Sequence, residues 1–192
     1  MLPVSFDNCN VVAELENGVK IMGETNIDVP RHDPNLRIVK AWLEPSASAS
    51  SDAVDAILKA DLVVLGPGDL FSSIIPNLLV KGIPEALKKS KAKKVYVCNL
   101  MTKHGETTSF KASNHLKEII KYGGCPDVIV CNSSKGSSFL LQKYASQNQF
   151  PVIVDGEEIA KLNVKLVQAD VMSAPELIRH DSEKLAELLL KL

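Results

Sequence analysis

The sequence predicts a protein of the α/β class, with a mostly parallel β-sheet between helices and a β-hairpin near the N-terminus. Short, continuous apolar runs recur after Asp61, and each ends at a glycine or beside an asparagine. Such runs are typical of strands buried on both faces of a parallel sheet. Helical patterns separate the runs, and this alternation of strand and helix indicates βαβ units.

The first third of the chain is expected to form antiparallel β-structure. Apolar-rich runs at 10–15 and 19–22 are joined by Glu16-Asn17-Gly18, and Asn-Gly is the strongest short hairpin signal. A turn at 23–26 follows, and alternating apolar and polar residues predict another strand at 37–43. After a loop rich in serine and alanine, a helix is expected to begin with a cap at Ser50, Ser51 or Asp52.

The remainder of the chain supplies the parallel sheet and its helices. Strands are expected at 62–65, 95–98 and 128–131, with shorter ones at 152–154 and 164–167. Helices are expected at 83–89, 112–122, 136–145 and 181–192. These spacings favour a Rossmann-like three-layer fold, and 192 residues is the length of one ordinary domain. We therefore expect a single domain over residues 1–192.

Composition argues against several classes of function. A net charge of −1 with scattered Lys and Arg disfavours binding along a polyanion. The four cysteines lack the two-residue spacing of metal knuckles, and no histidine pair completes a ligand set. There is no apolar run of about 20 residues, so no membrane span is expected. Because the first residues also lack the pattern of a secretion signal, we expect a cytoplasmic protein with reduced cysteines.

The strongest candidate for a ligand site is the loop Gly66-Pro67-Gly68-Asp69, which follows the first parallel strand. Glycine permits close approach of the backbone, and the helix start beyond it is expected to offer free amides to an anion. A plain tight turn in which Asp69 caps the helix is an equally good interpretation. The Asp69 carboxylate would also repel a phosphate, and it could instead face a ribose hydroxyl or a hydrated metal.

Two further loops follow parallel strands. Residues 99–107 combine amide, hydroxyl, amine, imidazole and carboxylate groups, although a solvated connector with a cap at Thr107 or Ser113 is the plainer interpretation. The loop at 132–136 gives a weaker signal. The cluster Arg179-His180-Asp181 has a structural interpretation, in which Asp181 begins the last helix and Arg179 pairs with a surface acid. No Ser-His-Asp set, metal motif or P-loop is evident.

These loops lie within longer motifs, namely Gly23-Glu24-Thr25-Asn26-Ile27, residues 60–80, 95–102, 105–107 and 113–116, and Leu177-Ile178-Arg179-His180-Asp181. Through them the chain resembles the CofD-like family, which joins 2-phospho-L-lactate transferases to bacterial gluconeogenesis factors of the YvcK type. The amino-acid sequence of residues 99–107 is similar to that of the gluconeogenesis factor branch. The resemblance implies a regulator of carbon metabolism and cell morphogenesis that binds a UDP-sugar and is not an enzyme.

The loops and the resemblance together imply a ligand site and no catalytic or metal-binding residue. Its members are Gly66, Pro67, Gly68, Asp69, Ser72, Ser73, Asn77, Asn99, Met101, Thr102, Glu106 and Thr107. Two alternatives stay open: a phospholactyl transferase of coenzyme F420 biosynthesis that uses Mg²⁺, and a truncated fragment that binds nothing. No other cofactor is expected.

The sequence also departs from the family pattern. Asp69 replaces the usual serine, Lys103 a glutamine, and Asn114 an aspartate. The glycine-rich strand, loop and helix with which family members begin has no counterpart in the 192 residues. Since a sheet without its first strands exposes an edge, we expect homo-oligomerisation or a separately encoded N-terminal partner segment.

Overall fold

The computed structural model describes residues 1–192 and contains a four-stranded parallel sheet of order β4-β5-β6-β7. Every neighbouring pair in it is parallel. Its strands are β4 (Leu62–Leu65), β5 (Lys93–Val97), β6 (Val128–Asn132) and β7 (Lys165–Ala169). The expected α/β class with a mostly parallel sheet flanked by helices is therefore confirmed.

A three-stranded antiparallel sheet of order β2-β1-β3 is formed by the first 44 residues. The expected hairpin is present as β1 (Asn10–Leu15) and β2 (Lys20–Met22), and β3 (Ile38–Glu44) pairs along the other side of β1. The turn expected at 23–26 is wrong, because these residues begin helix α1 (Glu24–Asp28).

The helices mostly follow the predicted patterns. They are α2 (Ser51–Lys59), α3 (Ile75–Leu78), α4 (Ile83–Lys89), α5 (Ala112–Lys121), α6 (Ser138–Ala145), α7 (Gly156–Ala160) and α8 (Ser182–Leu189). The Ser50 hydroxyl accepts from the Ala53 amide and the Asp181 carboxylate accepts from two amides of α8, so both expected caps are confirmed. A cap at Thr107 or Ser113 is wrong, since Lys111 precedes α5.

One expected strand is absent and two short ones are new. Residues 152–154 form only an isolated bridge between Lys111 and Ile153, because no neighbouring strand runs beside them for a full ladder. A two-stranded ribbon joins β8 (Met172–Ser173) to β9 (Arg179–His180).

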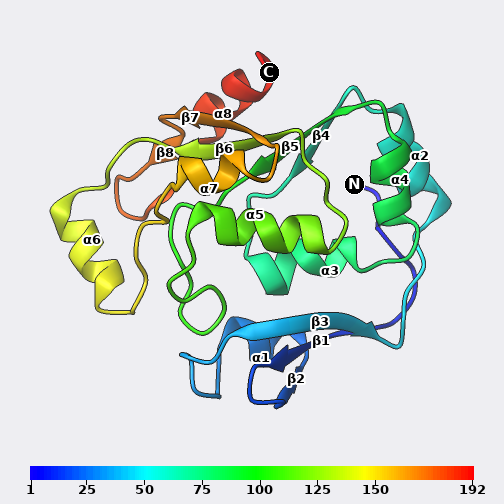
Figure 1. The fold of residues 1–192 in the computed structure, drawn as a ribbon, viewed down its shortest axis with the longest axis horizontal. Helices are drawn as coiled ribbons and strands as arrows, with labels where there is room; N and C mark the ends of the chain where they lie inside the picture. The colour runs from blue at the N-terminus through cyan, green and yellow to red at the C-terminus, as the bar shows by residue number, and fades with distance from the viewer.

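The elements stack in layers, with helices α3 and α5 between the two sheets and α8 on the far side of the parallel sheet (Figure 1). A cluster of 25 buried residues spans the inner layers and includes Leu15 from β1, Ile75 from α3 and Tyr96 from β5. On the opposite face, Val97 and Val130 pack with Leu185 of α8. Both faces of the central strands are thereby covered, which explains their uninterrupted apolar sequence.

Parallel strands place their exits at one edge of the sheet. The residues after β4 begin the Gly66-Pro67-Gly68 loop, and those after its neighbour β5 begin the loop at Asn99. The two loops therefore lie side by side, where ligands commonly bind in open α/β sheets. No helix in the chain has the length and apolar character needed to cross a bilayer.

Candidate functional site

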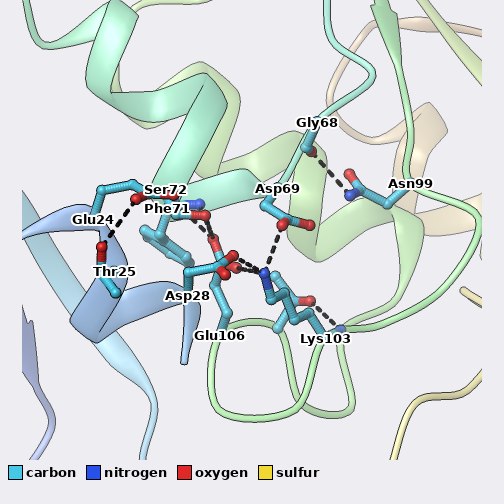
Figure 2. Close-up of polar contacts among 11 residues, drawn as sticks. Glu24, Thr25, Asp28, Gly68, Asp69, Phe71, Ser72, Asn99, Lys103 and Glu106 are labelled. Carbon is cyan, nitrogen blue, oxygen red and sulfur yellow. Dashed lines mark hydrogen bonds and ion pairs between the residues drawn. The ribbon is translucent and has the colours of Figure 1, made fainter. Parts of the chain in front are cut away.

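The loop after β4 packs tightly against the end of β5. Gly66 has a φ of 81°, and a Cβ built there lies 3.0 Å from Ile74 Cδ1 and 3.2 Å from the Val97 carbonyl oxygen. Glycine is therefore required both by the left-handed backbone and by the close approach. The Asn99 side-chain amide donates to the Gly68 carbonyl over 2.9 Å, which joins the two loops (Figure 2).

A π-helix, η1 (Leu70–Ile74), follows the glycine loop and leads directly into α3. The sequence predicts free amides at this helix start, and for Phe71 and Ser72 this is wrong. Both amides donate to Glu106 Oε1, the second over 2.8 Å. The Ser72 hydroxyl lies 3.3 Å from the same oxygen. The anion at this helix start is thus the protein's own carboxylate, which reaches it from a loop 35 residues away.

Glu106 is a fully buried acid, with a side-chain exposure of 0%. Burial, together with the nearby charge of Asp69, raises the pKa of Glu106 to about 7, against the opposing effects of the Ser72 and Phe71 amides and of Lys103. Its second oxygen, Oε2, has no hydrogen-bond partner and lies 3.9 Å from Lys103 Nζ. A buried acid with such a pKa changes charge close to neutral pH.

Lys103 lies among three carboxylates. Its ammonium donates to Asp28 of α1 and, over 2.6 Å, to Asp69 of the glycine loop, in addition to its approach to Glu106 (Figure 2). Burial disfavours the charge on Lys103, but the hydrogen bonds to Asp28 and Asp69 outweigh burial and raise its pKa. Lys103 is therefore a cation and not a base.

The ion pair between Lys103 and Asp69 explains why an aspartate is present at position 69 of the glycine loop. The side chain of Asp69 makes no capping hydrogen bond, so its interpretation as a helix cap is wrong. Asp69 and Lys103, both interpreted from the sequence as departures from the family pattern, instead bind each other. The charge of Lys103 also offsets the repulsion that the Asp69 carboxylate would exert on an anionic ligand.

A cleft of about 890 Å³ opens above these loops. From the predicted site it is lined by Pro67, Gly68, Asp69, Ser73, Asn99, Met101 and Thr102. The amides of Gly68 and Asp69 donate no hydrogen bond within the chain, and Asn99 Oδ1 is buried without a partner. The cleft therefore offers donors and an acceptor that the fold leaves unused.

Five predicted residues do not line the cleft. Gly66 and Asn77 face an adjoining groove instead, and Ser72, Glu106 and Thr107 are buried beneath it, each at most 6% exposed. The Thr107 hydroxyl accepts from the Lys103 amide over 2.9 Å. These buried groups hold the loops in place and do not reach the cleft surface.

The C-terminal segment contributes residues that were interpreted as structural from the sequence alone. Arg179, His180 and Ser182 line the cleft, together with Tyr144 of α6. The expected ion pair of Arg179 with a surface acid is wrong, because its guanidinium takes part in no ion pair or side-chain hydrogen bond. Burial lowers the pKa of His180, and its Nε2 has no partner. The resemblance of residues 177–181 to the family pattern was the one sequence signal that pointed to them.

No group of three or more His, Cys, Asp or Glu side chains is arranged to hold a metal ion. The carboxylates of Asp28, Asp69 and Glu106 are gathered around the Lys103 ammonium instead. All four cysteines are free thiols, with Cys98 and Cys131 buried in the sheet.

Comparison with known proteins shows which family and which relatives the chain resembles. The family model described as 2-phospho-L-lactate transferase CofD matches residues 1–172. A relative from Aquifex aeolicus is 39% identical over 100% of this chain and 60% of its own length. The gluconeogenesis factor of Bacillus subtilis is 36% identical over 100% of this chain and 61% of its own length.

The fold agrees with a solved structure as well. The crystal structure of a UPF0052 family member from Bacillus halodurans is 36% identical, with a TM-score of 0.92 over 98% of this chain and 61% of that one. The chain thus spans about three fifths of the length of the relatives it matches. By the extent of the family match and the identity to these relatives, the chain belongs to the CofD family and is of the gluconeogenesis factor type.

Proposed function

We propose that the cleft binds a nucleotide sugar, of the UDP-sugar class, and that the chain acts by binding and not by catalysis. The observation that carries the proposal is the gathering of unused polar groups in one cleft. The Gly68 and Asp69 amides, the Asn99 side-chain oxygen Oδ1 and the unpaired Arg179 guanidinium come from three different segments. A cleft of about 890 Å³ is within the usual range for small-molecule sites.

Each group has a chemical counterpart in such a ligand. The guanidinium of Arg179 suits a diphosphate, which it can bind through two parallel hydrogen bonds. The loop amides can donate to the same phosphates. The Asn99 side-chain oxygen can accept from a base or a sugar hydroxyl, and so can the carboxylate of Asp69, which lines the cleft.

The state of the ionisable groups supports binding without catalysis. Lys103 is held as a cation by two carboxylates, so it is not available as a nucleophile or general base. Glu106 is buried below the cleft and its Oε1 is occupied by two amides. In keeping with the gluconeogenesis factor relatives, the proposal includes a regulatory role in carbon metabolism and cell shape, in the cytoplasm.

A calorimetric titration of the purified chain with UDP-N-acetylglucosamine, GDP and NAD tests the proposal. Saturable binding of the UDP-sugar alone is expected, and Arg179→Gln should weaken it about 10- to 100-fold, since a hydrogen bond to a charged group contributes roughly 1.5–3 kcal/mol. The matched control is Arg37→Gln, which changes an exposed arginine far from the cleft in sequence. Equal affinity of both variants, or absence of binding, would refute the proposal.

The second candidate is a phospholactyl transferase, which the name of the matching family model favours. It predicts binding of GDP and transfer of a phospholactyl group to a deazaflavin in the presence of Mg²⁺. Formation of that product, measured by chromatography, would replace the binding proposal with this one. If none of the three nucleotides binds, the third alternative, a fragment without ligand affinity, is the correct one.

A further inference from the structure

Four charged side chains meet below the glycine loop, and they come from three separate segments of the chain (Figure 2). Asp28 belongs to α1, Asp69 to the glycine loop, and Lys103 and Glu106 to the loop after β5. We call this set the Lys103 cluster. Three carboxylates and one ammonium give it a charge of −2 when all are ionised, and protonation of Glu106 reduces this charge to −1.

The Lys103 cluster extends from the cleft surface into the protein interior. Asp69 and Lys103 both line the cleft, and their side chains are 37% and 21% exposed. Glu106 lies behind them with 0% exposure, and its Oε2 is 3.9 Å from the Lys103 ammonium. A charge that enters the cleft therefore meets Asp69 and Lys103 first. Its field also reaches Glu106, because charges interact more strongly across the protein interior than across water.

The two oxygens of the Glu106 side chain have unequal surroundings. Oε1 accepts from the amides of Phe71 and Ser72, and Oε2 is buried without a hydrogen-bond partner. A protonated carboxyl keeps an acceptor at its carbonyl oxygen, so Oε1 can retain both amides in either charge state. A proton can therefore be added at Oε2 without loss of any hydrogen bond in the structure.

Few other charged groups face Glu106. Helix α1 contributes Asp28 through its bond to Lys103, and η1 contributes only uncharged groups. Two histidines, His104 of the same loop and His115 of α5, make no hydrogen bond or ion pair with Glu106. The charge state of Glu106 is therefore governed by burial and by the members of the Lys103 cluster.

An anion in the cleft would act on Glu106 in the same direction as Asp69 does. Burial raises the pKa of Glu106 to about 7, the charge of Asp69 contributes to the rise, and Lys103 opposes it. A diphosphate beside Asp69 adds negative charge, and it also competes with Glu106 for the positive charge of Lys103. Both effects favour the protonated form of the buried acid.

We propose that ligand binding in the cleft is linked to a proton, so that an anionic ligand binds together with uptake of one solvent proton at Glu106 Oε2. The inference rests on the proposed function in that it requires an anion in the cleft, but it does not depend on the base or the sugar. Because such linkage is reciprocal, protonation of Glu106 strengthens ligand binding by the same factor. The protein therefore binds its ligand more tightly on the acidic side of neutral pH.

The size of the effect follows from the change in the pKa of Glu106. A neighbouring charge shifts the pKa of a carboxyl by roughly one to three pH units. For a further rise of about one unit on binding, the affinity at pH 6.5 exceeds that at pH 8.5 about fivefold. At pH 7.5, roughly half a proton is taken up for each ligand bound. Below the pKa of the free protein, Glu106 is already protonated and the affinity becomes constant.

The test is calorimetric titration of the full chain with UDP-N-acetylglucosamine at pH 6.5, 7.5 and 8.5, in buffers of different ionisation enthalpy. The diphosphate of this probe does not titrate in that interval, and burial lowers the pKa of His180 in the cleft, so His180 titrates below it. Glu106→Gln should abolish both the fivefold pH dependence and the proton uptake. The matched control Glu157→Gln, at an exposed position of α7, should retain both.

A second variant keeps the test decisive if Glu106→Gln fails to fold, as judged by circular dichroism. Asp69→Asn removes a charge that raises the pKa of Glu106, so the midpoint of the pH dependence should move to lower pH. A midpoint that stays in place or moves to higher pH would overturn the inference. Binding that is independent of pH, or that keeps its pH dependence in Glu106→Gln, would overturn it too and would leave the proposed function intact.

A different probe separates the inference from the proposed function. If UDP-N-acetylglucosamine does not bind at any pH, the proposed function fails, and titration with sodium sulfate, whose charge is constant in this interval, then decides the inference alone. Sulfate binding that is tighter at pH 6.5 than at pH 8.5 in the parent, and equal at both in Glu106→Gln, would support it. Absence of sulfate binding, or of the pH difference, would overturn it.

Discussion

Glu106→Gln tests the electrostatics beneath the cleft. The ordinary pKa of the acid is 4.5, and the folded protein raises it to about 7. At 1.36 kcal/mol per pH unit, this difference of about 2.5 units corresponds to about 3 kcal/mol. Because the folded state binds the proton more tightly, this contribution to stability is fully present below pH 4.5 and is lost as the pH rises through 7. Glutamine is neutral at every pH, so the variant loses none of this unfolding free energy between pH 4.5 and pH 7.

The assay is urea unfolding of both proteins at pH 4.5, 5.5, 6.5 and 8, followed by circular dichroism. The difference in unfolding free energy, variant minus parent, should rise by about 3 kcal/mol from the lowest to the highest pH. Glu176→Gln, at an exposed loop position, controls for removal of a negative charge. A difference that stays constant, or that falls with pH, would refute the reasoning, since the Phe71 and Ser72 amides and Lys103 would then outweigh burial.

Three further predictions concern single features of the fold. In a double-mutant cycle of Asp69→Ser and Lys103→Gln, urea unfolding should give a coupling of roughly 1 kcal/mol, and additive effects would exclude the ion pair. Burial lowers the pKa of His115 from 6.5 to about 4, so its stability contribution is present above pH 6.5 and declines toward pH 4. Relative to His115→Gln, the parent should lose about 3 kcal/mol over that interval, and equal pH profiles would contradict this. Gly66→Ala should cost at least 1–2 kcal/mol in thermal unfolding, roughly the left-handed backbone penalty, whereas Gly68→Ala, without a positive φ, should cost much less.

Elements that depend on local pattern were predictable from the sequence. The apolar runs of β5 and β6 were predictable because strands covered on both faces need no polar alternation, and β4 was predictable from the same pattern although Val64 is exposed. The hairpin at Asn17-Gly18 and the cap at Asp181 are also local signals. Residues 152–154 carry the same kind of signal and form no strand, because a ladder also requires a partner that the sequence around them does not specify.

The candidate site was predictable only in part. That the loops after β4 and β5 meet follows from the rule that parallel strands end at one edge. The sequence could not show that Arg179 and His180 reach the same cleft, since their position depends on how the last segment returns across the sheet. The sequence predicts an open edge of the sheet, and the order of the strands in the structure shows that β4 and β7 are the edge strands.

By itself the sequence determined the α/β class, most strands and helices, the family and the loops that border the cleft. Only the tertiary structure decided what the side chains of those loops do. Asp69 binds Lys103, 34 positions along the chain, and does not cap its own helix. The amides of Phe71 and Ser72 donate to Glu106, which is 35 positions from Phe71. The physical reason is that a charged group in a partly buried place pairs with whichever opposite charge or donor the fold brings within about 3 Å, whatever its distance along the chain.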